Sequence, residues 1–274
     1  LGNDRIGGLL FKLALPAILA QIINLLYNLV DRMYIGHIPG EGSAALTGVG
    51  VTMPVIMCIS AFAALVSMGG APRASIMMGK GNKEEAEKIM GNCATALFFT
   101  GIVLTVFFMI FSRKLLLLFG ASENTIEYGA SYMRIYAAGT LFVQAALGMN
   151  AFITAQGFAA VSMLSVVIGA VCNIILDPIF IFGCHMGVRG AALATILSQA
   201  VSAVWVIRFL TGEKTGLKLK RKNMKIQPKV FLPCMALGLS PFIMQSTESI
   251  LNICFNSSLL KYGGDMAVGA MTIL

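Results

Sequence analysis

Apolar runs of about 20 residues recur along the whole of this chain, and each is long enough to cross a hydrocarbon core about 30 Å thick. A membrane-spanning segment must satisfy its own backbone polar groups, so it forms either a helix or a strand of a closed barrel. Barrel strands are about 10 residues long and alternate in polarity, whereas these runs are longer and do not alternate. Charged residues make up only 12% of the chain, about half of the roughly 25% usual in soluble domains. The sequence therefore predicts an all-α, polytopic membrane protein.

We expect seven complete spans and the start of an eighth. Their approximate bounds are 9–35, 44–78, 86–111, 123–155, 159–183, 189–210, 230–260 and 266 onward. The first run is too long for the apolar core of a cleavable signal peptide, and no small-x-small cleavage site ends it. We therefore interpret it as the first span.

The basic residues predict the orientation of these spans. If successive spans alternate in direction, the side that holds the N-terminus collects 14 of the 20 Lys and Arg residues. The positive-inside rule then places the N-terminus in the cytoplasm of a multi-pass cell-membrane protein. The net charge of +8 is interpreted as this topology signal, and not as a site for nucleic acid. The basic stretch 212–229 becomes a cytoplasmic loop.

A weak internal repeat divides the chain. A shift of 224 residues aligns Gln21 with Gln245 and Asn28 with Asn252. Six spans separate the two copies, so both enter the membrane in the same direction, as in transporters built from parallel repeats. We expect a six-helix lobe at 1–211, a cytoplasmic inter-lobe loop at 212–229, and the start of a second, pseudo-symmetric lobe at 230–274. Both a piece of a twelve-helix protein, monomeric when full length, and a half that dimerises fit this pattern.

Two of the predicted helices carry matching polar stripes. Each stripe has steps of three and four residues, which place its members on one helix face, and the repeat aligns the two stripes position by position. The residues are Gln21, Asn24 and Asn28 in the first helix and Gln245, Glu248 and Asn252 in the seventh. Equivalent polar faces are expected for the walls of a shared substrate cavity. Hydrogen bonds between helices of the bundle are the alternative interpretation.

Three acidic residues lie inside predicted spans: Asp31, Asp177 and Glu248. A carboxylate at the centre of a membrane helix costs about 2.5–3.5 kcal/mol on insertion scales, so such residues are functional by default. Asp31 has an alternative role in a surface pair with Arg32, near the end of its helix.

Two of these carboxylates are expected at one level of the membrane. Counted from the helix ends, Asp31, Asp177 and Thr195 lie at similar depths, and Asn173 is one turn from Asp177. Pro178 leaves a backbone carbonyl without its helical donor near the same place. Carboxylate, amide, hydroxyl and carbonyl oxygens suit a hard cation such as Na+. The same carboxylates could instead exchange protons, because burial and mutual repulsion disfavour their charged forms.

The chain resembles the multidrug and toxic compound extrusion (MATE) transporters. The resemblance rests on LALPAILAQIINLLYNLVDRMYIG in the first helix, MGKGNKEEAEKIM in the next inner loop, and NIILDPIFIFG followed by GVRGAALATILSQ. It implies twelve helices in two lobes, a central cleft and export of drugs by cation antiport. It also implies a cation site at Asp31, Asn173, Asp177 and Thr195, with Glu248 as the acidic residue of the seventh helix. The family's acidic position on helix ten has no counterpart in this chain.

Our hypothesis is a secondary antiporter, not an enzyme, that exports amphipathic or cationic small molecules in exchange for Na+ or H+. It needs no cofactor beyond this coupling ion, its surroundings are the lipid bilayer, and no nucleotide-binding loop is present. Cation entry is expected to bend the first helix near Pro16, while Pro178 is a second candidate hinge. One alternative is a flippase for lipid-linked precursors or polysaccharides, which would line its cavity with basic residues. A membrane-embedded enzyme is the other, and it would need a nucleophile with a base, or a metal set.

Overall fold

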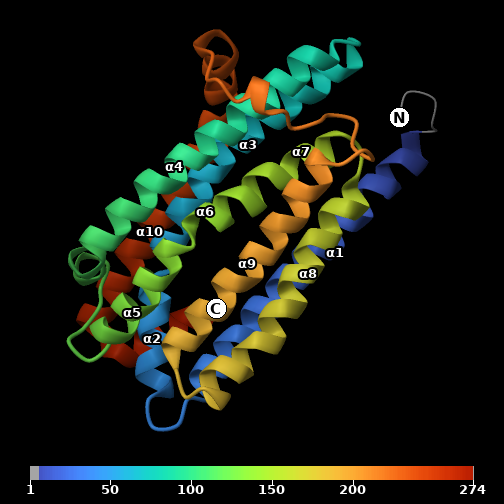
Figure 1. The fold of residues 1–274 in the computed structure, drawn as a ribbon. Helices are drawn as coiled ribbons and strands as arrows, with labels where there is room; N and C mark the ends of the chain where they lie inside the picture. Colours follow the sequence, from blue (N-terminus) through green and yellow to red (C-terminus); the bar gives the residue numbers. More distant parts are fainter. Residues whose placement is uncertain (1–5, 274) are drawn as a thin grey trace.

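The computed structural model describes residues 6–273, and in this part of the chain every regular element is a helix. The first helix, α1, runs over Ile6–Gly36. The second span consists of α2 (Gly42–Val51) and α3 (Met53–Gly79), which are separated only by Thr52. The third is α4, the 36-residue helix Lys83–Leu118. These four helices run up and down the bundle (Figure 1).

The fourth span is broken in several places. It comprises α5 (Ile126–Ala138), α6 (Thr140–Val143), a π-helical turn over Gln144–Gly148, and α7 (Met149–Ala155). The segments before and after Gly139 differ in direction by 58°. A hydropathy pattern contains no signal for such a bend, because every segment is apolar.

The remaining spans complete the bundle. Helix α8 (Ala159–Pro178) continues into a second π-helical turn over Ile179–Gly183, and α9 covers Val188–Thr211. A short 3-10 helix at Arg221–Asn223 interrupts the next connection. The last helix, α10, covers Pro228–Ile273 and kinks at Gly264, where a φ of 66° favours glycine.

The predicted spans are confirmed. Six described helical segments are long and apolar enough to cross a membrane, or seven if the bent fourth span is included. The predicted start at residue 230 and the predicted break near 260–266 correspond to the start and the kink of α10. The fold is therefore an all-α polytopic membrane fold, as expected. Of the basic residues in the topology argument, Arg5 lies outside the described residues.

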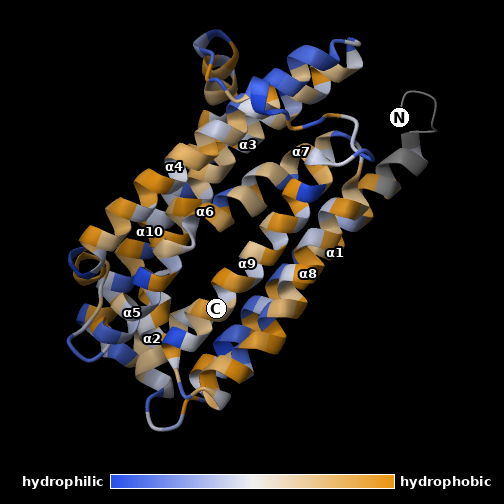
Figure 2. Ribbon diagram, viewed as in Figure 1, coloured by the Kyte–Doolittle hydropathy of each residue, from blue (hydrophilic) through white to orange (hydrophobic). Residues whose placement is uncertain are grey.

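The bundle has two chemically different ends. One, which we call the basic end, carries residues 79–83, 156–158 and 212–227; the other, the far end, carries residues 37–41, 119–125 and 184–187. Figure 2 shows hydrophilic residues gathered at the ends and hydrophobic residues dominating the middle of the helices. Large apolar side chains such as Leu25 and Ile110 are exposed on the outside, as expected where lipid replaces water.

Helix α4 begins with a side-chain cap. The amide N–H of Glu85 donates to the side-chain oxygen of Asn82 over 3.2 Å, which satisfies one of the free N–H groups of the first turn. Glu84 and Glu85 lie in that turn, where negative charge is favoured by the helix dipole. The third span therefore begins at Lys83, three residues before the predicted start at residue 86.

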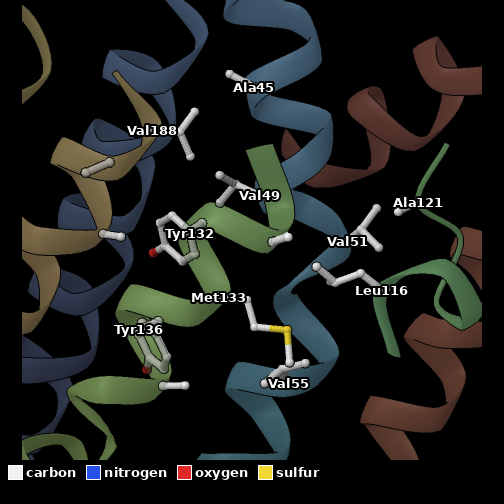
Figure 3. Close-up of a cluster of buried hydrophobic side chains, with 14 of the residues drawn as sticks. Ala45, Val49, Val51, Val55, Leu116, Ala121, Tyr132, Met133, Tyr136 and Val188 are labelled. Carbon is white, nitrogen blue, oxygen red and sulfur yellow. The ribbon is translucent and has the colours of Figure 1, made fainter. Parts of the chain in front are cut away.

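Two clusters of buried apolar side chains form the interior. The first lies toward the far end and contains Val49, Met133 and Tyr136 (Figure 3). The second lies toward the basic end and joins α3, α4, α7 and α9 to Val230 and Cys234 of α10. Helix α10 packs chiefly against α3, so the last span is closely attached to the helices that precede it.

Candidate functional site

An acidic cluster lies inside the bundle, where three helices meet. Asp31 comes from α1, and Asn173 and Asp177 come from α8, which packs alongside α1. Asp31 is 9% exposed and the other two are fully buried. The carboxyl groups of Asp31 and Asp177 lie close together, and the amide of Asn173 donates to Asp177 over 3.2 Å. The structure thus brings together three of the four residues predicted for the cation site.

Several oxygens of this cluster lack a partner. Among the described residues, Oδ1 of Asp31, Oδ2 of Asp177 and Oδ1 of Asn173 are buried and accept no hydrogen bond. A buried, unsatisfied polar atom costs about 1–3 kcal/mol, and more when the group is charged. Two adjacent carboxylates also repel each other when both are charged. A bound cation or a shared proton would relieve both costs, so the cluster has the chemistry of an ion site.

Thr195 and a tyrosine complete this region. The hydroxyl of Thr195, on α9, donates to the carbonyl of Ala191 one turn earlier over 3.0 Å. Thr195 also lies near the hydroxyl of Tyr132 on α5, a side chain close to Asp31. Tyr132 stacks on Tyr136, with ring centroids 6.1 Å apart. The predicted fourth ligand therefore borders the cluster.

Sequence reasoning missed the tyrosines. Tyr27 of α1 also lies near Asp31 and Asp177, so phenol groups reach the carboxylates from two helices. A tyrosine inside an apolar span is common packing material, because only its hydroxyl is polar. The one available signal was the four-residue spacing of Tyr132 and Tyr136, which places both on one helix face.

Pro178 and Pro16 differ in their local structure. Pro178 is the last residue of α8, and the π-helical turn begins directly after it. A proline removes a backbone donor, and π-helical turns are frequent at functional sites. Pro16 lies inside α1, which remains helical on both sides of it.

A cavity of about 620 Å³ lies on the basic-end side of the acidic cluster. Gln21 and Asn24 are ten and seven residues before Asp31, so they lie about 15 and 10 Å from it along α1. None of the described residues that line the cavity is charged. Its polar lining residues are Gln21, Asn24, Ser67, Ser75, Asn150, Thr154 and Ser162.

The predicted polar stripes are only partly assembled around this cavity. Asn28 is not among its lining residues and donates to the carbonyl of Asn24 on its own helix over 2.7 Å. The members from α10 are also absent from the lining: Glu248 is exposed, and Asn252 donates to its carbonyl over 2.9 Å. Gln245 is half-buried. In the described part of the chain, the cavity is therefore a feature of α1, α3, α7, α8 and the π-helical turn over Gln144–Gly148.

The site does not have the donor set of a transition-metal centre. No group of three or more His, Cys, Asp or Glu side chains gathers in residues 6–273. The acidic cluster instead offers two carboxylates, an amide and a hydroxyl nearby, which are donors for a hard cation. Fold and site together are those of an integral membrane protein with a buried ionisable pair and an uncharged cavity, features that are typical of membrane transporters.

Comparison with known proteins identifies the family. The MatE family model matches residues 16–179. The chain belongs to this family, the multidrug and toxic compound extrusion (MATE) transporters. The resemblance noted in the sequence is thereby confirmed.

Individual relatives agree with this assignment. The multidrug export protein MepA of Staphylococcus haemolyticus is 25% identical over 250 residues, which cover 91% of this chain and 55% of the relative. A solved structure of the MATE multidrug transporter DinF-BH in complex with a dye is 32% identical, with a TM-score of 0.92, over 99% of this chain and 60% of its own. An inward-facing multidrug resistance MATE family transporter is 27% identical, with a TM-score of 0.85, over 94% of this chain and 60% of its own.

These relatives are transporters and not enzymes. The chain spans about half the length of the curated relatives it matches, 55% in the case of MepA.

Proposed function

We propose that this protein is the transport core of a secondary antiporter, which exports amphipathic or cationic compounds in exchange for Na+ or H+. The observation that carries the proposal is the proximity of the Asp31 and Asp177 carboxyl groups, whose unpartnered oxygens lie about 10–15 Å along α1 from an uncharged, largely apolar cavity. One helix thus contributes both to an ion site and to a cavity wall.

The coupling step follows from this shared helix. A cation or proton that enters the cluster removes the repulsion between the two carboxylates, so α1 and α8 can approach each other. Gln21 and Asn24 move with α1, and Pro16, about one turn before Gln21, is the proposed hinge. The ligands for Na+ are Asp31, Asn173, Asp177 and Thr195, and the two carboxylates alone serve for H+.

The cavity supports substrates with a large apolar surface and few specific polar contacts. Amide and hydroxyl groups line it together with Met68, Leu147 and Val166, and Asn150 has a buried amide oxygen without a partner. That oxygen can accept a hydrogen bond from an ammonium or amine group. The multidrug exporters and the dye complex among the relatives support the same substrate class.

The proposal keeps three further sequence-based expectations. The distribution of Lys and Arg supports a cell-membrane protein with a cytoplasmic N-terminus, at the basic end of the bundle. The repeat supports a lobe at 1–211, the loop 212–229 and a second lobe from 230, in which Gln245, Glu248 and Asn252 line the cleft from the other side. The full-length transporter is proposed to act as a monomer.

The test is dye transport by the full-length protein in proteoliposomes under an imposed Na+ or pH gradient. Wild type should move the dye with one gradient, and Asp31→Asn and Asp177→Asn should reduce this flux at least about tenfold, the cost of one charge-assisted interaction. Glu123→Gln removes an equal charge from an exposed position at the far end and should leave the flux unchanged.

Two results would contradict the proposal. Gradient-driven dye flux that persists in both aspartate variants would assign the carboxylates a structural role. Flux of a lipid-linked phosphate without flux of the dye would favour the flippase, although no basic residue is among the described residues that line the cavity.

A further inference from the structure

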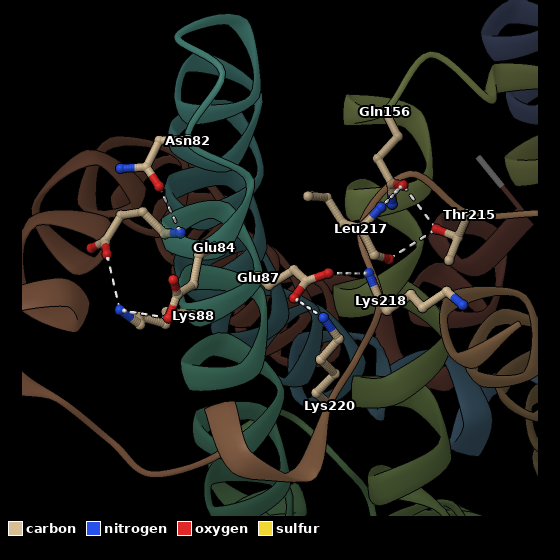
Figure 4. Close-up of polar contacts among 10 residues, drawn as sticks. Asn82, Glu84, Glu87, Lys88, Gln156, Thr215, Leu217, Lys218 and Lys220 are labelled. Carbon is tan, nitrogen blue, oxygen red and sulfur yellow. Dashed lines mark hydrogen bonds and ion pairs between the residues drawn. The ribbon is translucent and has the colours of Figure 1, made fainter. Parts of the chain in front are cut away.

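The segment 212–227, between α9 and α10, is bound tightly to the end of the bundle. The amide N–H of Leu217 donates to the side-chain oxygen of Gln156 over 2.7 Å, and that of Lys218 donates to Glu87 over 3.2 Å (Figure 4). The ammonium of Lys220 pairs with the same Glu87 over 2.6 Å, although Glu87 is only 3% exposed. The segment is therefore a fixed part of the surface and not a free linker.

Further bonds fix the second half of this segment against α4. The side-chain oxygen of Asn92 accepts from the N–H of Gln227, and its amide group donates to the carbonyl of Asn223 over 3.4 Å. The hydroxyl of Thr95 donates to the carbonyl of Met224 over 2.6 Å. The backbone from 223 to 227 thus lies directly on the third and fourth turns of α4.

This contact sets the depth of the segment in the membrane. One turn after Thr95, the side chains of Phe98 and Phe99 are more than half exposed, and the apolar surface of α4 continues from there. Exposed phenylalanines mark the hydrocarbon region of the bilayer. Met224 therefore lies at the boundary between the acyl chains and the headgroups.

The exposed side chains at this boundary combine positive charge with apolar surface. Met224 and Ile226 are 37% and 44% exposed. The basic side chains around them, also exposed, are Arg221, Lys222, Lys225 and Lys229. Of the basic residues in 212–229, only Lys220 has a carboxylate partner among the described residues.

We propose that Arg221, Lys222, Met224, Lys225, Ile226 and Lys229 form a binding surface for the headgroups of anionic phospholipids. The ammonium and guanidinium groups contact the lipid phosphates, while Met224 and Ile226 insert between the acyl chains, as in interfacial anchors. A soluble polyanion would match the charges but would leave these two apolar side chains in water. The surface needs neither the coupling ion nor the cavity of the proposed transport function.

The experiment titrates full-length protein in a neutral detergent with phosphatidylglycerol and with phosphatidylcholine of the same acyl chains. Bound lipid is read by native mass spectrometry. Wild type should prefer phosphatidylglycerol. The triple variant Lys222→Gln/Lys225→Gln/Lys229→Gln should bind this lipid about a hundredfold more weakly, because each lysine contributes a factor of about five to the affinity. The same three lysines replaced by arginine should retain the preference.

A matched control removes three exposed charges at the far end, with Arg113→Gln/Lys114→Gln/Lys261→Gln, and should retain binding at the basic end. Met224→Ser/Ile226→Ser should weaken lipid binding but leave binding of a soluble polyanion such as RNA unchanged. Competition by inorganic phosphate should be at least tenfold weaker than by phosphatidylglycerol. Equal loss in the far-end control, an unchanged lipid preference in the lysine variant, or stronger competition by RNA or phosphate than by lipid would each overturn the proposal.

Discussion

Helices α3 and α10 cross in the half of the bundle nearer the basic end, with two glycines at the contact. A Cβ atom added to Gly69 would lie 1.8 Å from the carbonyl oxygen of Cys234, and one added to Gly238 would lie 1.7 Å from that of Leu65. In membranes, small residues allow helix backbones to approach in this way, and van der Waals packing then holds the helices together. Alanine at Gly69 should therefore separate α3 from α10.

The size of the effect follows from the geometry. The distance between the added Cβ of Gly69 and the carbonyl oxygen of Cys234 must increase from 1.8 Å to at least 3.0 Å. This oxygen belongs to the backbone, so no side-chain rotation can relieve the clash. Overpacking of this kind costs about 1–3 kcal/mol, and it also outweighs the gain of up to about 1 kcal/mol that alanine brings to a helix interior. We expect Gly69→Ala to lower the thermal unfolding midpoint by a few degrees, at about 2–4 °C per kcal/mol for a chain of this size.

The assay is thermal unfolding of purified protein in detergent, followed by fluorescence. Gly79→Ala, at the last residue of the same helix, is the control, since nothing lies within 4 Å of its added Cβ. Its midpoint should equal or exceed that of wild type. If Gly69→Ala is as stable as Gly79→Ala, the close crossing of α3 and α10 is not a feature of the folded protein.

Three further changes test polar contacts of different depth. Glu87→Ala removes a buried acceptor and should cost about 1–3 kcal/mol, because the N–H of Lys218 loses its partner, while the ammonium of Lys220 is partly exposed and can be solvated; hydrogen exchange at residues 214–220 should rise, whereas Glu84→Ala should leave it unchanged. Asn82→Ala removes the N-terminal cap of α4 and should lower the free energy of unfolding by about 1 kcal/mol. Thermal unfolding measures this loss, with Asn124→Ala as the control. Arg113→Ala breaks a 2.8 Å ion pair with Glu127 but should change stability by less than about 1 kcal/mol, because both side chains are well exposed; a larger loss in unfolding would refute this estimate.

The existence and approximate positions of the spans could be predicted from sequence, because the thickness of the bilayer fixes the length of each apolar run. Their ends were less accurate, since α4 extends to Leu118 and its predicted end was residue 111. The contact between Asp31 and Asp177 was also accessible, since depth along each helix follows from a rise of about 1.5 Å per residue. The roles of these residues as ion ligands stay predictions. The sequence could not predict how each helix is rotated about its axis or where it bends, because both depend on packing. The break at Gly139 and both π-helical turns are examples.

The bound state of segment 212–227 was equally inaccessible. Its lysines predict a loop in water, and the acceptors that hold it, Glu87, Asn92 and Gln156, lie far away in sequence. Polar side chains at helix ends usually contact solvent. Only the three-dimensional structure shows that these three contact the backbone of the loop.

The π-helical turn over Gln144–Gly148 also affects comparison with relatives. Such a turn accommodates one extra residue within a continuous helix, and one residue of an α-helix corresponds to a rotation of about 100°. Side chains after the turn, such as Asn150 and Thr154 at the cavity, therefore face a different direction from that predicted by counting on from Thr140. An alignment with a relative that lacks this turn requires a gap of one residue here, or every later position of the span is matched to the wrong face.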